Sequence, residues 1–115
     1  MREKREKRLN NEFRKYLYEV LTMEVKNPDI TEMFTIMEVE TTADLKYADV
    51  LVSVYSTSPE KKQKTFNAIV ESGAYARRII SQKMHIRTVP EFRFKLDGSM
   101  EYGAHIDELL EKIKQ

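Results

Sequence analysis

The stretch that decides the fold is a long amphipathic helix pattern, SPEKKQKTFNAIVESGAYARRIISQKM, at residues 58–84. Ser58 followed by Pro59 has the composition of a helix start, with serine as the N-cap and proline in the first turn. Gly73 interrupts the apolar stripe near its middle, and a glycine there costs roughly 1 kcal/mol relative to alanine. The run Ser72-Gly73-Ala74 therefore predicts a kink that divides this segment into two helices.

The rest of the chain predicts three strands and two further helices around this kinked pair. Apolar periodicity places them at residues 5–25 (helix), 33–42 and 48–55 (strands), 89–96 (strand) and 102–113 (helix). The short turn between the first two strands predicts an antiparallel hairpin. In the first strand, Phe34 and Ile36 would share a face with Glu38 and Glu40, so we expect one end of that face to leave the core.

This order predicts an α+β fold in which helices cover one face of a three-stranded sheet. We treat residues 1–115 as a single domain, because this length supports one core without disulfides. The chain has no cysteine, no apolar run long enough for a membrane span and no pattern of a secretory signal. We therefore expect no membrane association, and a cytoplasmic location fits this composition.

Charge is segregated along the chain, although the formal net charge is only +1. Residues 1–15 carry seven basic and three acidic side chains, and residues 60–95 carry nine basic and three acidic. The intervening residues 16–59 carry two basic and eight acidic side chains, and residues 96–115 two basic and five acidic. Such segregation favours one basic face, which is a candidate surface for nucleic acid, although solvated helices can have the same pattern.

Five local sequences resemble the bacterial ribosome-binding factor A family over nearly the whole chain. They are LTMEVKNP (21–28), FTIMEV (34–39), ADLKYADV (43–50), IRTVPEFRF (86–94) and DGS (97–99). The resemblance implies a type II KH-like domain, with the order helix, strand, strand, kinked helix pair, strand, helix. The family has an Ala-x-Gly interruption between the paired helices, and here it falls on Ser72-Gly73-Ala74, with the glycine one position early.

The resemblance also implies a function without catalysis. Family members bind the immature 30S ribosomal subunit and its 16S rRNA, support late processing of that RNA and matter most in the cold. We accordingly expect an RNA-binding assembly factor with no catalytic residue, no metal and no cofactor. We also expect a monomer, since no exposed heptad or long apolar stripe demands a dimer.

Arginines and small residues around the kink are the main candidates for contact with RNA, because the guanidinium group suits phosphate oxygens. The candidate RNA-binding residues are Arg5, Arg8, Ser72, Gly73, Ala74, Tyr75, Arg77, Arg78, Lys83 and Arg87. Arg93 and Lys95 extend the basic set along the third strand. Arg77 is the favoured single contact. A structural role is as good an interpretation for Arg87, and helix capping is the more usual role for Ser72.

Three other interpretations remain open at the level of sequence. Phosphate contacts alone do not distinguish an assembly factor from a general KH-like RNA chaperone. A metal-dependent nuclease would use the carboxylates Glu38, Glu40, Asp44 and Asp49, which have no histidine partner in the sequence and form no recognisable metal motif. A protein-interaction module would use the charged faces directly. His85 and His105 lack a second ligand at metal-binding spacing.

Overall fold

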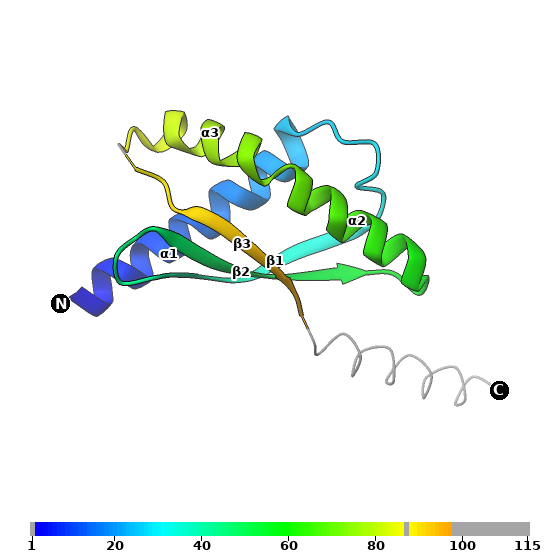
Figure 1. Ribbon diagram of the computed structural model, residues 1–115, viewed down its shortest axis with the longest axis horizontal. Helices are drawn as coiled ribbons and strands as arrows, with labels where there is room; N and C mark the ends of the chain where they lie inside the picture. The colour runs from blue at the N-terminus through cyan, green and yellow to red at the C-terminus, as the bar shows by residue number, and fades with distance from the viewer. Residues whose placement is uncertain (1, 87, 98–115) are drawn as a thin grey trace.

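The computed structural model describes residues 2–86 and 88–97 (Figure 1). The elements are α1 (Arg2–Glu19), a π-helical turn η1 (Val20–Glu24), β1 (Met33–Thr41), β2 (Tyr47–Tyr55), α2 (Pro59–Glu71), α3 (Gly73–Met84) and β3 (Glu91–Leu96). The expected helices and strands within the described residues are therefore confirmed, with shifts of a few residues at their ends. The helix expected over residues 102–113 lies outside the described residues.

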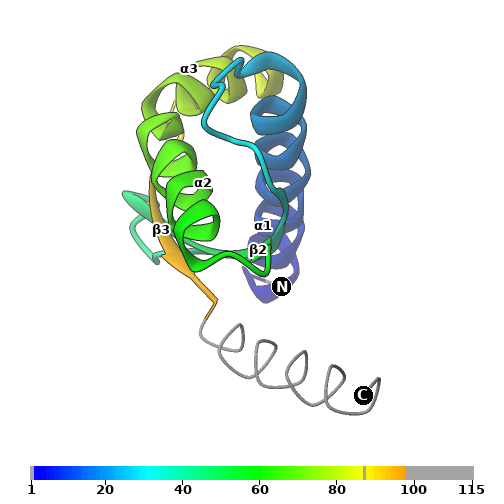
Figure 2. The ribbon, with the colours of Figure 1, turned by 90° about the vertical axis from the view of Figure 1, so that its right-hand side faces the viewer.

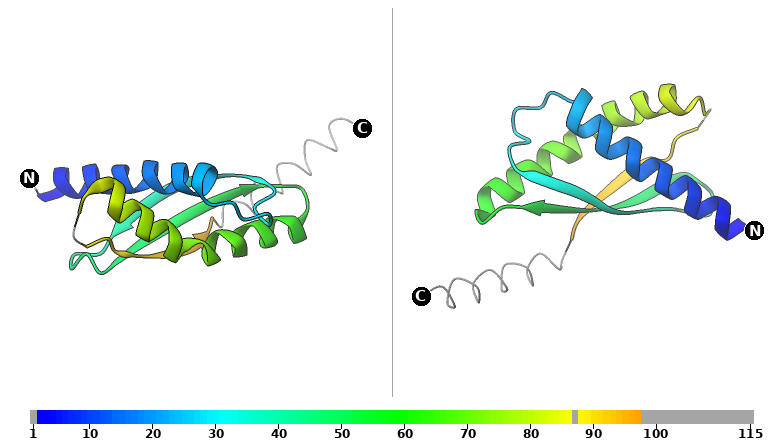
Figure 3. Two further views of the ribbon diagram at one scale, coloured as in Figure 1. Left: turned by 90° about the horizontal axis from the view of Figure 1, so that it is seen from above. Right: turned by 180° about the vertical axis from the view of Figure 1, so that it is seen from behind.

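The three strands form one mixed sheet in the order β1-β2-β3. β1 and β2 are antiparallel, as the hairpin predicts, whereas β2 and β3 run parallel because the α2–α3 pair connects them as a crossover. Figure 2 shows the helices gathered on one side of the sheet, and Figure 3 shows that α1 approaches α3 and diverges from α2. This arrangement confirms the predicted α+β fold with helices on one face.

A β-bulge in β1 overturns one expectation. The register of β1 on β2 shifts between Ile36 and Glu38, so Met37 is the additional residue of the bulge. After this point Val39 faces the core and is 4% exposed, while Glu38 and Glu40 are exposed. The prediction that one end of the core face would leave the core is wrong, because the bulge changes which side chains face inward and keeps both ends of β1 packed.

The first helix packs an apolar stripe onto the sheet and ends in a π turn. Phe13 and Leu17 are almost completely buried, as the helical period predicts. In η1 the Val25 amide donates to the Val20 carbonyl at 2.8 Å, which is an i to i+5 bond. In the same turn the Thr22 hydroxyl donates a hydrogen bond to the Tyr18 carbonyl at 2.8 Å. The helix therefore stops just before Asn27-Pro28, where proline disfavours helical backbone.

The α2–α3 junction is a break of one residue, Ser72. At the start of α2 the Ser58 hydroxyl accepts a hydrogen bond from the Lys61 amide, which confirms the predicted N-cap. Ser72 is buried, and its hydroxyl donates to the Ala68 carbonyl at 2.8 Å. α3 ends at His85, whose left-handed backbone (φ 53°) turns the chain toward β3. The predicted kink at Ser72-Gly73-Ala74 is thus confirmed.

Gly73 lies in close contact with a side chain of β3. Gly73 does not have a positive φ, so its backbone conformation is one that other residues also adopt. A Cβ built on residue 73 would lie 2.8 Å from Cε2 of Phe94 on β3, which is closer than real Cβ atoms approach. The absent side chain therefore lets the start of α3 rest directly on the Phe94 ring.

We predict that Gly73→Ala lowers stability, although alanine is the better helix former. The usual gain of about 0.4–1 kcal/mol is outweighed by the roughly 1–3 kcal/mol that overpacking costs. Urea unfolding of the wild type, Gly73→Ala, Phe94→Leu and the double variant tests this. We expect the alanine to cost less, or to stabilise, when residue 94 is leucine. Stabilisation by Gly73→Ala in the wild-type background would contradict the contact.

Candidate nucleic-acid interface

One shallow groove brings together several of the residues predicted to contact RNA. We call it the α3 groove; its volume is about 470 Å³ and it runs between α3 and the segment that leads into β3. It is lined by Ala74, Arg77, Arg78, Ser81, Gln82, Thr88 and Val89. Helical spacing explains the first five, because residues three and four apart share one face of α3. The groove presents two arginines to solvent beside hydroxyl and amide groups, which suits a phosphate backbone.

Arg77 and Arg78 occupy different positions in this groove. The Arg77 Nε donates to the Val89 carbonyl at 2.9 Å, so its guanidinium holds the segment before β3 against α3. Arg78 is exposed and has no ion pair or hydrogen bond within the described part of the chain. Arg77, the contact that the sequence favoured, thus already holds the Val89 carbonyl. The guanidinium group of Arg78 has no such partner.

The residues of the kink divide into internal and exposed groups. Ser72 is 7% exposed and bonded to its own helix, which agrees with the capping alternative. Gly73 faces Phe94. Tyr75 is 47% exposed and precedes Arg78 by three residues, so both side chains lie on the same side of α3. Only Ala74 and Tyr75 therefore present their side chains to a ligand at the start of α3.

Lys83 connects two helices. Its ammonium group lies 2.7 Å from a Glu24 carboxylate oxygen and 3.4 Å from one of Glu19. The hydrogen bond to Glu24 is the main reason that the pKa of Lys83 is raised above its usual range. This residue joins α3 to the end of α1, so its charge is already partly compensated.

Two other predicted contacts lie away from the α3 groove. Arg5 and Arg8 are exposed on α1, and Arg8 forms a loose ion pair with Glu12 at 3.8 Å. Neither residue lines the groove. Arg87 lies outside the described residues. The structure thus groups three of the ten candidates, Ala74, Arg77 and Arg78, in one groove, with Tyr75 beside them.

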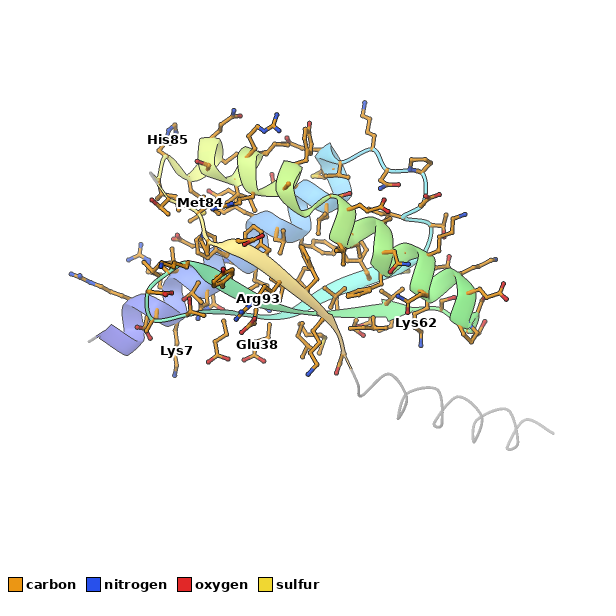
Figure 4. The ribbon with its side chains drawn as sticks, in the orientation of Figure 1. Lys7, Glu38, Lys62, Met84, His85 and Arg93 are labelled. Atoms are coloured by element: carbon orange, nitrogen blue, oxygen red, sulfur yellow. The ribbon has the colours of Figure 1, made fainter. Side chains whose placement is uncertain are left out.

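Arg93 and Lys95 belong to a different surface from the arginines of α3. They lie on the face of the sheet opposite to the helices, where Arg93 donates two hydrogen bonds to Asp49, at 2.7 and 3.1 Å. Its guanidinium also lies 4.6 Å from the centre of the Tyr47 ring. Asp49 is the main cause that raises the pKa of Arg93. Figure 4 shows Arg93 and Glu38 labelled on this side.

Arg93 and Lys95 do lie along the third strand, as expected, but they share no surface with the arginines of α3. Strand alternation points both side chains to the open face, whereas Phe92, which is buried, and Phe94, which lies between them, face the helices. Glu38 and Glu40 line the same hollow as Arg93 and Lys95. This face of the sheet is mixed in charge, with carboxylates beside each cation.

The described residues contain no group of three or more side chains that could hold a metal ion. They likewise contain no helix long and apolar enough to cross a membrane.

The sequence analysis did not name every residue of the α3 groove. The residues that it missed are Ser81, Gln82 and Thr88. Ser81 and Gln82 each follow an arginine of the groove by four residues, and this helical spacing is the signal that could have identified them.

The helix pair inserted between two strands of a mixed sheet, with arginines in a groove along its second helix, defines a type II KH-like domain. Comparison with known proteins makes the family specific. The family model for ribosome-binding factor A matches residues 5–110, and the chain belongs to this family.

Relatives and solved structures agree with this assignment. The chain is 40% identical over 107 residues to ribosome-binding factor A of Clostridium botulinum (strain Eklund 17B), covering 93% of this chain and 92% of that protein. It is 39% identical over 111 residues to the factor of Caldanaerobacter subterraneus, covering 96% and 90%. The solution structure of a putative ribosome-binding factor A from Thermotoga maritima matches with a TM-score of 0.66 at 28% identity, covering 82% and 89%. The crystal structure from Thermus thermophilus shares the fold, with a TM-score of 0.67 at 15% identity, covering 79% and 93%.

We predict that Arg77 and Arg78 differ in their effect on stability. Arg77→Met should lower the free energy of unfolding by about 1 kcal/mol, because the Val89 carbonyl loses its donor. Arg78→Met should stay within about 0.5 kcal/mol of the wild type, as is usual for an exposed side chain without a partner. Urea unfolding followed by circular dichroism measures both variants. Equal stability of the two would show that the bond to Val89 contributes little.

Proposed function

We propose that this chain is an assembly factor that binds the immature 30S ribosomal subunit through its 16S rRNA. In this proposal it acts by binding, without a catalytic step, supports late processing of the 16S rRNA and is important at low temperature. It would act as a monomer in the cytoplasm, where small subunits mature. The observation that carries the proposal is the α3 groove with Arg77 and Arg78, in a chain that belongs to the ribosome-binding factor A family.

A structural relative supports the choice of partner. A homology model of the Thermus thermophilus factor, fitted into a cryo-electron-microscopy map of a complex of that factor with the 30S subunit, matches with a TM-score of 0.58 at 14% identity. The match covers 75% of this chain and 88% of that one. At this identity the match demonstrates shared fold, and the binding of 30S subunits by this chain is our inference from the family.

The groove chemistry fits an RNA backbone. Arg78 offers a guanidinium fork to solvent, and Gln82 and Thr88 add neutral donors along the same groove, whereas the Ser81 hydroxyl donates to the Ile86 carbonyl. Ala74, at the first turn of α3, keeps that end of the groove free of a large side chain. The kink therefore allows a phosphate backbone to approach α3 closely beside two arginines.

We predict that charge reversal at Arg78 weakens association with free 30S subunits while leaving the fold intact. Arg78→Glu and the matched control Lys61→Glu, on the first turn of α2, should have wild-type circular dichroism spectra. Co-sedimentation in sucrose gradients should show loss of the Arg78 variant, but not of the control, from the 30S fraction. If both variants sediment with 30S subunits like the wild type, the groove is not the interface.

The same gradients separate this function from that of a general RNA chaperone. An assembly factor should accompany immature 30S subunits and be absent from assembled ribosomes, and its deletion should leave unprocessed ends on 16S rRNA, most strongly in the cold. A chaperone without ribosome specificity should instead bind unrelated RNA equally well and leave 16S ends unchanged.

We predict a steep dependence of RNA affinity on salt. With about five phosphate contacts, the logarithm of the binding constant should fall with the logarithm of salt concentration with a slope of roughly −3.5 to −4.5. Filter binding or fluorescence anisotropy over a salt series measures this slope. A flat response would rule out an interface dominated by phosphate contacts.

A further inference from the structure

We propose a second RNA contact, a subsite for an unpaired nucleotide at the edge of the sheet opposite to the α3 groove. It is a hollow of about 280 Å³ between α1 and β1, which we call the α1–β1 pocket. Its lining residues are Arg14, Lys15, Tyr18, Thr35 and Ile36. Because β1 and β3 are the two edge strands, this pocket and the α3 groove lie at different edges. The choice of RNA as ligand rests on the proposed function.

Helical geometry brings the aromatic ring and the arginine together. Arg14 and Tyr18 are four residues apart on α1, so their side chains are neighbours on one stripe of the helix. The core side chains Phe13 and Leu17 point elsewhere and are buried. The same stripe continues through Asn11 to Lys7, both exposed. In Figure 4 the Lys7 side chain points away from α3, so this flank of α1 is distinct from the flank near the groove.

Tyr18 has the properties of a stacking platform. Its ring is 44% exposed, yet it packs on Phe34 of β1 with the ring centres 5.5 Å apart and the planes tilted by 56°. Phe34 itself is buried and fixes the position of Tyr18. An exposed ring that is held in place loses little conformational entropy when a base stacks on it.

The cations of the pocket are uncompensated. Arg14 and Lys15 are both exposed, and neither has an ion-pair partner in the part of the chain that the structure describes. In contrast, Lys83 and Arg93 are each paired with a carboxylate. Two free cations directly beside an exposed, fixed ring match the phosphate and the base of one nucleotide.

The β1 side of the pocket favours a single strand over a duplex. β1 is hydrogen-bonded to β2 on one side only, so it is an edge strand whose outer side has backbone groups that the sheet does not use. A base can lie on Tyr18 and reach these groups only if it is not already stacked and paired in a helix. The pocket therefore fits an unpaired nucleotide of a loop, bulge or strand end.

The test uses the full chain and a labelled single-stranded oligoadenylate, with a duplex of equal length as comparison. Tyr18→Leu keeps an apolar contact with Phe34 but removes the ring, and should weaken binding of the oligoadenylate by about 5-fold or more. Tyr18→Phe should retain affinity, because it retains the ring. The matched control is Tyr55→Leu, which removes a tyrosine that is 56% exposed at the end of β2.

Charge is tested in parallel with Arg14→Gln/Lys15→Gln against Lys61→Gln/Lys62→Gln, an adjacent pair on α2. Figure 4 shows Lys62 at the opposite end of the molecule from Lys7. Loss of two phosphate contacts should flatten the log–log salt slope by about 1.4 for the first pair only, at about 0.7 per contact on a single strand. Thermal melts confirm that each variant is folded.

The outcomes separate this proposal from the proposed function. Equal effects of Tyr18→Leu and Tyr55→Leu on the oligoadenylate would overturn the subsite, whether or not the wild type binds 30S subunits. Loss of 30S binding by the Tyr18 variant with unchanged oligoadenylate affinity would also overturn it, because the pocket would then contact a protein. A wild type that binds the oligoadenylate through Tyr18 but ignores 30S subunits would support the subsite and contradict the proposed function.

Discussion

The close approach of Gly73 to the Phe94 ring is the contact on which the packing of the start of α3 against β3 depends. Because residue 73 has no side chain, the first turn of α3 rests on a ring of β3. One turn further along α3, the Arg77 Nε donates to the Val89 carbonyl at 2.9 Å, and the segment before β3 forms the second wall of the α3 groove. A Cβ at residue 73 would require the Phe94 ring or the start of α3 to shift.

The helices are also held to each other, so their cations form a fixed pattern. Lys83 of α3 forms ion pairs with Glu19, at the end of α1, and with Glu24, in the π turn η1. In the same turn the Thr22 hydroxyl donates to the Tyr18 carbonyl. These ion pairs are partly exposed to solvent, so they contribute little to the free energy of unfolding. Their main effect is to hold the end of α3 next to the end of α1. α1 and α3 consequently present Arg14 and Arg78 from one rigid layer, toward opposite edges of the sheet.

Charge is divided between the two sides of the sheet. The helical side carries the exposed arginines without partners, whereas on the open face Arg93 is held by Asp49 and by the Tyr47 ring. The bulge at Met37 contributes to this division, because it turns Glu38 and Glu40 to the open face while Val39 enters the core. The free positive charge is thereby on the helical side, and negative charge lies beside the cations of the open face.

The sequence by itself determined the order of the elements, the Ser58 cap, the break at Ser72-Gly73-Ala74 and the family. These features depend on periodicity and on neighbours three or four residues away, which are visible in one dimension. Only the tertiary structure decided why residue 73 is glycine, that β1 contains a bulge, and which cations are free. Three cations have partners that lie between 12 and 59 residues away along the chain: Arg77 with Val89, Lys83 with Glu24, and Arg93 with Asp49. Whether an arginine can bind RNA depends on which carbonyl or carboxylate lies beside it in space, and the folding of distant segments sets that distance.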